Sequence, residues 1–339
     1  MQKSYYYHLV TTSSLMSNTR WTLLALLGIW YATSCSTHQP VTSTVKDQLH
    51  IVFVIGDEEY RSEESMPMIA RILKRELGAK ISLCYSVDDK GIIDPNNQHH
   101  IEGLEALETA DLMIMFTRFR QLPSDQLKYI TDYAESGKPM VGFRTSTHAF
   151  WYLTAEGELD TTMNHLNKAW PTEVFGQQWI THHGHFDDGS YPLTEVDLAD
   201  TDHPITKGVS PFQAYSWLYY VDVGDWQFYG DPHILLRGTS LKSNHEQHNR
   251  LDQFALTNPV AWTKEYGGAK VFFTTLGHPY DFKNDNMRKL VLNGIFWSLD
   301  LESTIPAEGV DPSIVGSYDP NNSGFGDRFK QGVVPVYKM

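Results

Sequence analysis

Cysteine and positive charge are both scarce in this chain of 339 residues. Only two cysteines are present, Cys35 and Cys84, so a small domain held together by disulfides is excluded. Lysine and arginine number 27 against 41 acidic residues, and the resulting net charge of −14 argues against a nucleic-acid partner. Hydrophobic residues make up 41% of the chain, which excludes a disordered or collagen-like protein and allows a large α/β core.

The N-terminus lacks acidic residues up to residue 34. A basic residue precedes the apolar run Trp21–Tyr31, which is too short to span a bilayer, and the small residues before Cys35 resemble a bacterial lipobox. These features predict a lipoprotein signal peptide over residues 1–34, a lipid anchor to the membrane at Cys35 and a linker over residues 35–48. We therefore expect an exported lipoprotein in the periplasm, at the outer membrane or on the cell surface.

Strand and helix patterns alternate in the first half of the chain, which predicts a parallel sheet covered on both faces. We expect a three-layer α/β/α fold with a mostly parallel sheet over residues 49–300, interrupted by an insertion over about 151–258. Residues 301–339 lack a periodic pattern and form a C-terminal arm that is either wrapped or disordered. The expected strands are 51–55, 80–85, 112–116, 139–143, 193–197, 217–223, 233–238, 259–262 and 270–275, and the expected helices are 65–77, 100–109, 124–136 and 285–299.

Ligands of open parallel sheets bind beyond the carboxyl ends of the strands, so the residues that follow each strand are the first candidates for a site. Five carboxylates occur within eight residues after the first strand. They would repel phosphate, and they suit sugar hydroxyls, a cation or acid/base chemistry. Asp57, Glu58 and Tyr60 are the candidate substrate-binding residues, whereas Glu63 and Glu64 fit a solvated helix start equally well.

The strand expected at 139–143 leads into Arg144 and His148. A sharp turn there would raise Arg144 above the sheet, where a guanidinium can polarise a carbonyl oxygen, and His148 could transfer protons. The alternative for Arg144 is a structural ion pair with the acidic loop.

His278 follows the strand expected at 270–275 and is a further acid/base candidate, unless it only caps a turn. Cys84 has no neighbouring base and is interpreted as a core thiol.

Three histidines occur within four residues, His182, His183 and His185. Alternating residues of a strand share one face, so His183 and His185 could ligate a divalent metal such as zinc, while His182 is a candidate acid/base. Exposed histidines near a turn are the simpler alternative, and no other cofactor is indicated. Aromatic rings suit the C–H faces of sugars, and the candidates to stack on a sugar ring are Trp179, Trp217, Tyr219 and Trp262.

Several separated segments together resemble the ThuA-like (trehalose utilisation) family, namely residues 51–64, 138–150, 170–182, 203–206 and 260–297. The resemblance implies a flavodoxin-like fold of the class I glutamine amidotransferase type and a carbohydrate ligand. Alignment with the Gly-x-Cys-x-Gly motif of the amidotransferases puts Arg144 at the position of the nucleophile, which excludes glutaminase chemistry. His278-Pro279 stands where those enzymes have His-Pro-Glu, with Tyr280 in place of the acid.

We therefore predict a membrane-tethered protein that acts on a glycoside or keto-sugar by acid/base chemistry, with hydrolysis, elimination and isomerisation all open. Arg144 would polarise a carbonyl oxygen, and His148, His182 or His278 would transfer the proton. Two alternatives remain, a non-catalytic sugar-binding or scaffold protein and a metal-dependent hydrolase that uses the histidines and Asp57. Assembly into a homo-oligomer is left open by the sequence.

Overall fold

The computed structural model describes residues 48–184, 190–221 and 227–339. The predicted signal peptide, the predicted lipidation site Cys35 and the metal-ligand candidate His185 lie outside the described residues. The described residues form one compact unit. In the described part of the chain, no helix combines the length and the apolar character needed to cross a bilayer.

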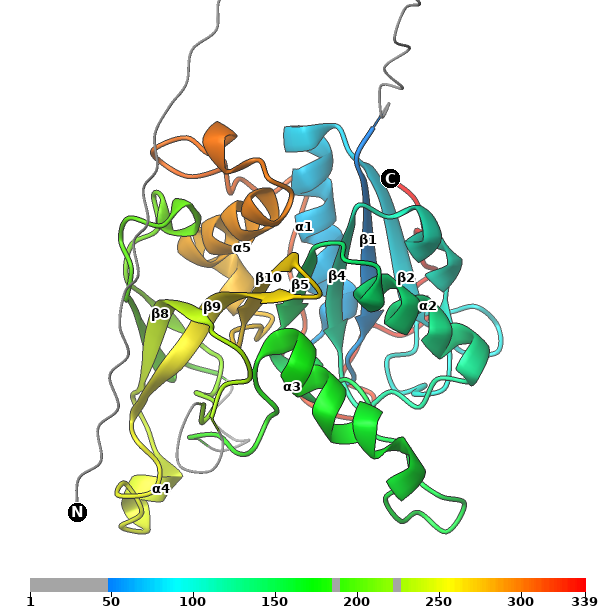
Figure 1. Ribbon diagram of the computed structural model, residues 1–339, viewed down its shortest axis with the longest axis horizontal. Helices are drawn as coiled ribbons and strands as arrows, with labels where there is room; N and C mark the ends of the chain where they lie inside the picture. Colours follow the sequence, from blue (N-terminus) through cyan, green and yellow to red (C-terminus); the bar gives the residue numbers. More distant parts are fainter. Residues whose placement is uncertain (1–47, 185–189, 222–226) are drawn as a thin grey trace, which may run out of the picture. The chain divides into compact units, whose positions relative to one another are not determined.

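Five parallel strands form the centre of a single sheet (Figure 1). Their spatial order is β2-β1-β4-β5-β10, the flavodoxin order, and each neighbouring pair among them is parallel. The prediction of an α/β fold with both halves of the chain in one sheet is thereby confirmed. The five strands are β1 (His50–Gly56), β2 (Lys80–Ser86), β4 (Leu112–Thr117), β5 (Met140–Phe143) and β10 (Ala269–Thr274).

Antiparallel strands extend this sheet on both sides. Beyond β10 lie β9 (Thr257–Tyr266), β8 (His233–Ser240), β6 (Thr194–Leu198) and β7 (Phe212–Ala214), and β3 (Ile101–Glu102) pairs with β2. The region predicted as an insertion thus contributes strands to the same sheet. The strand expected at 217–223 is wrong in its described part, because Tyr219 forms only an isolated bridge with His182.

Helices cover both faces of the sheet because alternate side chains of each strand point to opposite faces. Ile51, Phe53 and Ile55 of β1 pack in one core with α1 (Ser62–Leu77) and α5 (Asp285–Ser298). Val52 and Val54 pack in the second core with α2 (Ser124–Glu135) and α3 (Trp170–Phe175), which completes the predicted three layers. The short helical segments are Leu104–Thr109, Arg144–His148, Thr161–Met163, Pro204–Thr206, Asp281–Lys283 and Glu302–Thr304 (all 3₁₀), the π-helix His165–Ala169, and α4 (Asn244–Gln247).

Two predicted helix boundaries are wrong. α1 begins at Ser62 instead of Ser65, directly after Arg61, whose left-handed backbone (φ 53°) turns the chain from the β1 loop into the helix. The helix expected at 100–109 is instead the short strand β3 followed by a 3₁₀ helix.

The interpretation of Cys84 as a core thiol is confirmed, since it is buried in β2 and burial raises the pKa of the thiol.

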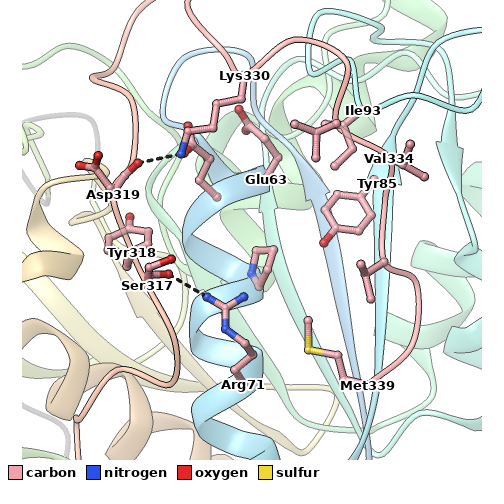
Figure 2. Close-up of a pocket in the computed structure, with 14 residues that line it drawn as sticks. Glu63, Arg71, Tyr85, Ile93, Ser317, Tyr318, Asp319, Lys330, Val334 and Met339 are labelled. Carbon is pink, nitrogen blue, oxygen red and sulfur yellow. Dashed lines mark hydrogen bonds and ion pairs between the residues drawn. The ribbon is translucent and has the colours of Figure 1, made fainter.

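The C-terminal arm (residues 301–339) wraps over α1, as Figure 2 shows for the hydrogen bond from Arg71 to Ser317. Arg71 Nε donates a hydrogen bond to Val315 O at 2.8 Å, and Arg75 Nη1 donates one to Ser313 O at 2.7 Å. The end of the arm pairs with β2 through an isolated antiparallel bridge at Lys338. The wrapped alternative is therefore correct, and a cavity of about 310 Å³ without any histidine in its wall lies between the arm and α1.

Replacing Arg71 with Ala is expected to loosen the arm without unfolding the sheet. A hydrogen bond from a charged donor contributes about 1 kcal/mol at a partly exposed site, so amide hydrogen exchange over residues 313–324 should rise about fivefold. Hydrogen-exchange mass spectrometry measures this. Lys128→Ala is the control, because Lys128 is exposed on α2. Unchanged exchange in Arg71→Ala would mean that other contacts hold the arm.

Candidate active site

A cavity of about 350 Å³, the strand-end cavity, lies at the carboxyl ends of β1, β4 and β5. Each of these strands is followed by at least one residue of the cavity wall, as expected for an open parallel sheet. The wall brings together five of the predicted site residues, namely Tyr60, His148, Trp179, His182 and Tyr219. It also contains Glu59, Arg118, Thr181, Gly184 and Asn244.

Arg144 lies behind this wall. Its left-handed backbone (φ 38°) makes the sharp turn after β5 that the sequence predicted, but the side chain points into the protein, so the expectation of an exposed Arg144 is wrong. The guanidinium is completely buried between the rings of Tyr60 and Tyr219, 4.2 and 4.4 Å from their centroids. It donates hydrogen bonds to the Tyr60 hydroxyl at 3.0 Å and to the carbonyls of Trp217 and Thr275. Arg144 therefore positions two aromatic rings of the cavity, and its direct contact with a ligand stays a prediction.

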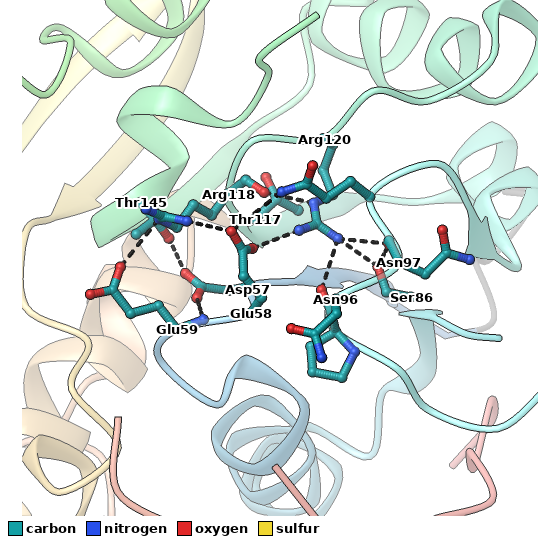
Figure 3. A network of polar contacts seen from close by, with 12 residues as sticks. Asp57, Glu58, Glu59, Ser86, Asn96, Asn97, Thr117, Arg118, Arg120 and Thr145 are labelled. Carbon is teal, nitrogen blue, oxygen red and sulfur yellow. Dashed lines mark hydrogen bonds and ion pairs between the residues drawn. The ribbon is translucent and has the colours of Figure 1, made fainter. Parts of the chain in front are cut away.

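The carboxylates of Asp57 and Glu58 form hydrogen bonds and ion pairs with other groups of the protein (Figure 3). The Asp57 carboxylate accepts hydrogen bonds from the backbone N–H groups of Glu59 and Tyr60, both at 2.7 Å, and from the Thr145 hydroxyl. Glu58 forms ion pairs with two arginines, Arg118 and Arg120. Neither carboxylate lines the strand-end cavity, so their predicted contacts with substrate hydroxyls gain no support from the geometry.

Glu59 is the carboxylate that does line the strand-end cavity. Burial raises the pKa of its carboxyl group to about 7, helped by the charge of Asp57 and opposed by Arg118. Arg118 Nε lies 3.2 Å from Glu59 Oε2. A carboxyl group that titrates near neutrality can both take up and release a proton under ordinary conditions, which is the property of an efficient acid/base catalyst.

His148 and His182 add two neutral imidazoles to the same wall. Burial, together with the charges of Arg118 and Arg144, holds the pKa of His148 well below its usual range, and burial lowers the pKa of His182 to about 4. The His148 ring lies 5.2 Å from the Trp179 ring. A neutral imidazole offers one donor and one acceptor nitrogen, and in both rings the donor is Nδ1, which binds His183 O in His182 and the Thr147 hydroxyl in His148. The wall can therefore accept hydrogen bonds from hydroxyl groups at Nε2 of these rings.

His278 lies outside the strand-end cavity and is covered by the C-terminal arm. Its Nδ1 accepts a hydrogen bond from the Tyr280 N–H, and Nε2 is 2.9 Å from the Ser323 hydroxyl. Burial lowers the pKa of this histidine to about 3. These contacts fit a buried structural histidine, and the predicted acid/base role of His278 stays a prediction.

The two remaining tryptophan candidates also lie outside the cavity wall. Trp262 is buried in the core, and its indole N–H donates a hydrogen bond to Phe175 O at 2.8 Å. Trp217 stacks on the ring of His182, with 4.9 Å between the centroids. Trp217 therefore supports a wall residue, and stacking of either tryptophan on a sugar stays a prediction.

The histidine cluster gives little support to a zinc site. His183 Nδ1 is 2.6 Å from the Ser243 hydroxyl and Nε2 is 2.9 Å from Ala255 O, so both ring nitrogens are engaged. His185 lies outside the described residues. Within residues 48–184, 190–221 and 227–339, no three His, Cys, Asp or Glu side chains are grouped as metal ligands. The metal-dependent alternative stays a prediction.

The family model described as ThuA, trehalose utilisation, matches residues 51–298. This chain belongs to the ThuA family. The matched segment includes every residue that lines the strand-end cavity and stops before the C-terminal arm. No curated protein matches the sequence.

Three solved structures are similar to this chain at low sequence identity. A ThuA-like protein from Bacteroides uniformis is 14% identical over 74% of this chain and 91% of its own, with a TM-score of 0.46. One from Parabacteroides merdae is 13% identical over 84% and 100%, with a TM-score of 0.47. The carbohydrate deacetylase Agd3 is 11% identical over 75% of this chain and 32% of its own, with a TM-score of 0.38. Similarity this low says nothing about the substrate of this ThuA domain.

Four polar wall residues were not singled out from the sequence, namely Glu59, Arg118, Thr181 and Asn244. The signal for two of them was present. Glu59 belongs to the acidic run after β1, and Arg118 directly follows β4, where the rule on strand ends applies. Thr181 lies in an irregular segment and Asn244 begins the short helix α4, and neither has a sequence pattern that could have identified it.

The buried His278 is expected to make the ThuA domain sensitive to acid. Its pKa is about 3 in the folded state against 6.5 when exposed, so the unfolded state binds more protons between these values and stability falls as the pH drops below 6.5. At pH 5 the loss is about 2 kcal/mol. In His278→Asn, which keeps an acceptor for the Tyr280 N–H, the loss of unfolding free energy between pH 7 and 5 should be smaller by about that amount.

Urea unfolding at the two pH values measures this difference. His165→Asn is the control, because His165 is exposed on the surface. An identical pH dependence in wild type and His278→Asn would show that His278 is not a buried neutral group.

Proposed function

We propose that this ThuA protein is an enzyme that acts on a glycoside or keto-sugar by acid/base chemistry, with Glu59 as the group that transfers the proton. One observation carries the proposal: a carboxyl group whose burial raises its pKa to about 7 faces the same cavity as the neutral imidazoles of His148 and His182. Only Glu59 among these three groups changes its charge near neutral pH, so it is assigned the acid/base role.

The two histidines are assigned the binding of polar substrate groups. Nδ1 of His182 donates a hydrogen bond to His183 O at 3.1 Å, and Nδ1 of His148 donates to the Thr147 hydroxyl at 3.2 Å. Because both rings stay neutral, each would accept a hydrogen bond from a substrate hydroxyl at Nε2 without adding charge next to Arg118 and Arg144. A sugar hydroxyl next to Glu59 would thus be oriented for proton transfer. Deprotonated Glu59 would remove a proton from carbon or from water, and protonated Glu59 would return it to oxygen.

The volume and the aromatic lining of the strand-end cavity support a ligand of about one sugar ring. Its volume of about 350 Å³ lies near the lower end of the range of about 300–1,000 Å³ for small-molecule sites, which suits one sugar ring. Trp179, Tyr219 and Tyr60 contribute rings to the wall, and such rings pack against the C–H faces of a sugar. The turn after β5 carries Arg144, so proton transfer without a covalent thiol intermediate fits this site better than amidotransferase chemistry.

Replacing Glu59 with Gln is expected to lower kcat/KM by about 10²-fold or more, because the amide cannot transfer the proton. His148→Asn should cost a similar factor if His148 orients the substrate next to Glu59. The assay is conversion of a panel of keto-sugars and glycosides by the wild-type protein and its variants. The wild-type rate should change with pH near 7, and this change should be absent from Glu59→Gln.

Glu156→Gln is the matched control, because Glu156 is an exposed glutamate far from the cavity wall. Wild-type turnover in Glu59→Gln would rule out the assigned role. Sugar binding without conversion of any compound in the panel would favour the alternative of a non-catalytic sugar-binding protein.

We further propose that the protein is exported and anchored to a membrane by a lipid on Cys35. The apolar run and the small residues before this cysteine support the proposal, together with a ThuA domain that begins after the linker. Each buried methylene of an acyl chain adds about 0.8 kcal/mol of membrane affinity.

Replacing Cys35 with Ser should abolish incorporation of labelled palmitate and move the protein from the membrane fraction to the soluble fraction. Cys84→Ala is the matched control, because the other cysteine is buried in β2. Labelling that persists in Cys35→Ser would contradict the anchor.

A further inference from the structure

The tip of the C-terminal arm, residues 321–325, lies on the loop that carries Glu59. Gly324 N–H donates a hydrogen bond to Glu59 O at 2.8 Å. In the other direction, Arg61 Nη2 donates a hydrogen bond to Gly324 O at 2.7 Å. The two bonds fix one residue of the tip to both ends of the segment Glu59–Arg61.

The same tip covers the cation that pairs with Glu59. The Arg118 guanidinium lies over the rings of Phe119 and Phe325, 4.2 and 5.0 Å from their centroids. Arg118 also forms ion pairs with Glu58 and with Glu59. An aromatic face on a guanidinium attracts the charge and limits the access of water, so Phe325 helps to fix the position of Arg118.

Two further contacts anchor the arm tip. The Ser323 hydroxyl is 2.9 Å from His278 Nε2, and the backbone N–H of Asn321 donates a hydrogen bond to Glu64 Oε1 at 3.2 Å. Just beyond the tip, Lys330 forms an ion pair with Glu64. The tip thus forms hydrogen bonds with the loop after β1, with α1 and with the segment after β10.

We propose that the arm tip is part of the acid/base site, and that Phe325 and Gly324 are positioning residues that hold Arg118 and Glu59 in place at the strand-end cavity. The proposal rests on the proposed function and assigns a role to a segment that lies beyond the matched ThuA residues. The tip itself carries no charge, so it acts by contact. The charged or titratable groups that face Glu59 are Arg118, Asp57, Arg144 and Tyr60, and the cavity wall adds His148, His182 and Tyr219.

The test is the titration of the Glu59 carboxyl group, which needs no substrate. Carbon-13 NMR of protein labelled at glutamate side-chain carboxyls follows it, and the signal missing from Glu59→Gln gives the assignment. In Phe325→Ala, Arg118 loses the ring that lies over its guanidinium and is held less firmly next to Glu59. Because the charge of Arg118 lowers the pKa of Glu59, the Glu59 titration should move toward higher pH by about half a unit or more.

Two variants control for other effects. Phe325→Tyr keeps the ring over Arg118 and should titrate like the wild type. Val334→Ala removes an exposed side chain elsewhere in the arm and should also leave the titration unchanged. A shift in Phe325→Ala that is absent from Val334→Ala supports the proposal, and an upward direction identifies the weakened contact of Arg118 with Glu59 as the cause. Equal titrations of Glu59 in Phe325→Ala and wild type would overturn it.

Activity separates this proposal from the proposed function. If no sugar is converted but the titration shifts in Phe325→Ala, the proposed reaction fails and the coupling between arm and Glu59 stands. If sugars are converted and the titration does not shift, the arm proposal fails alone. Where turnover is found, Phe325→Ala should shift the pH profile in the same direction as the titration and lower kcat more than it changes KM.

Discussion

The buried charge of Arg144 is the interaction on which the site depends. Removing a guanidinium from water costs several kcal/mol unless hydrogen bonds and favourable electrostatic contacts compensate. Here the compensation comes from the Tyr60 hydroxyl, from the carbonyls of Trp217 and Thr275 and from the faces of two tyrosine rings. These partners belong to the loop after β1, to the region predicted as an insertion and to the end of β10. One cation thus joins three segments that are far apart in the sequence.

The turn that carries Arg144 has the strained backbone of a nucleophile elbow, but its side chain is a buried cation and not an exposed nucleophile. A positive φ at a non-glycine residue costs about 1–3 kcal/mol and persists only where the surroundings hold it. In this ThuA domain the turn directs a long cationic side chain inward instead of presenting a short nucleophile to a ligand. The reactive group that we propose therefore comes from a neighbouring segment, since the loop after β1 and the residue after β4 line the same cavity as the segment after this turn.

Much of the fold could be predicted because it depends on local patterns. Buried strands such as Ile51–Ile55 form continuous apolar runs, and the glycine at position 78 ends α1 with a positive φ, as expected. The rule on strand ends located the site near Tyr60 and His148. It could not tell Glu58 from Glu59, because the Asp57 carboxylate binds the next backbone N–H groups and fixes the direction of each side chain. Contacts made by an arm without periodic pattern could not be predicted at all.

The roles of the cavity groups follow from a competition between burial and charge. Burial favours the neutral form of both carboxyl and imidazole groups, so it raises the pKa of Glu59 and lowers that of His148. Arg118 lowers both values, and for the histidine its effect adds to burial, whereas for the glutamate it opposes burial. The pKa of His148 is therefore held far below 7, while the opposing effects on Glu59 leave its pKa at about 7. Burial is the largest effect on both groups, and Arg118 adds to it at His148 and opposes it at Glu59, so the roles proposed for the two groups depend on where that arginine is held.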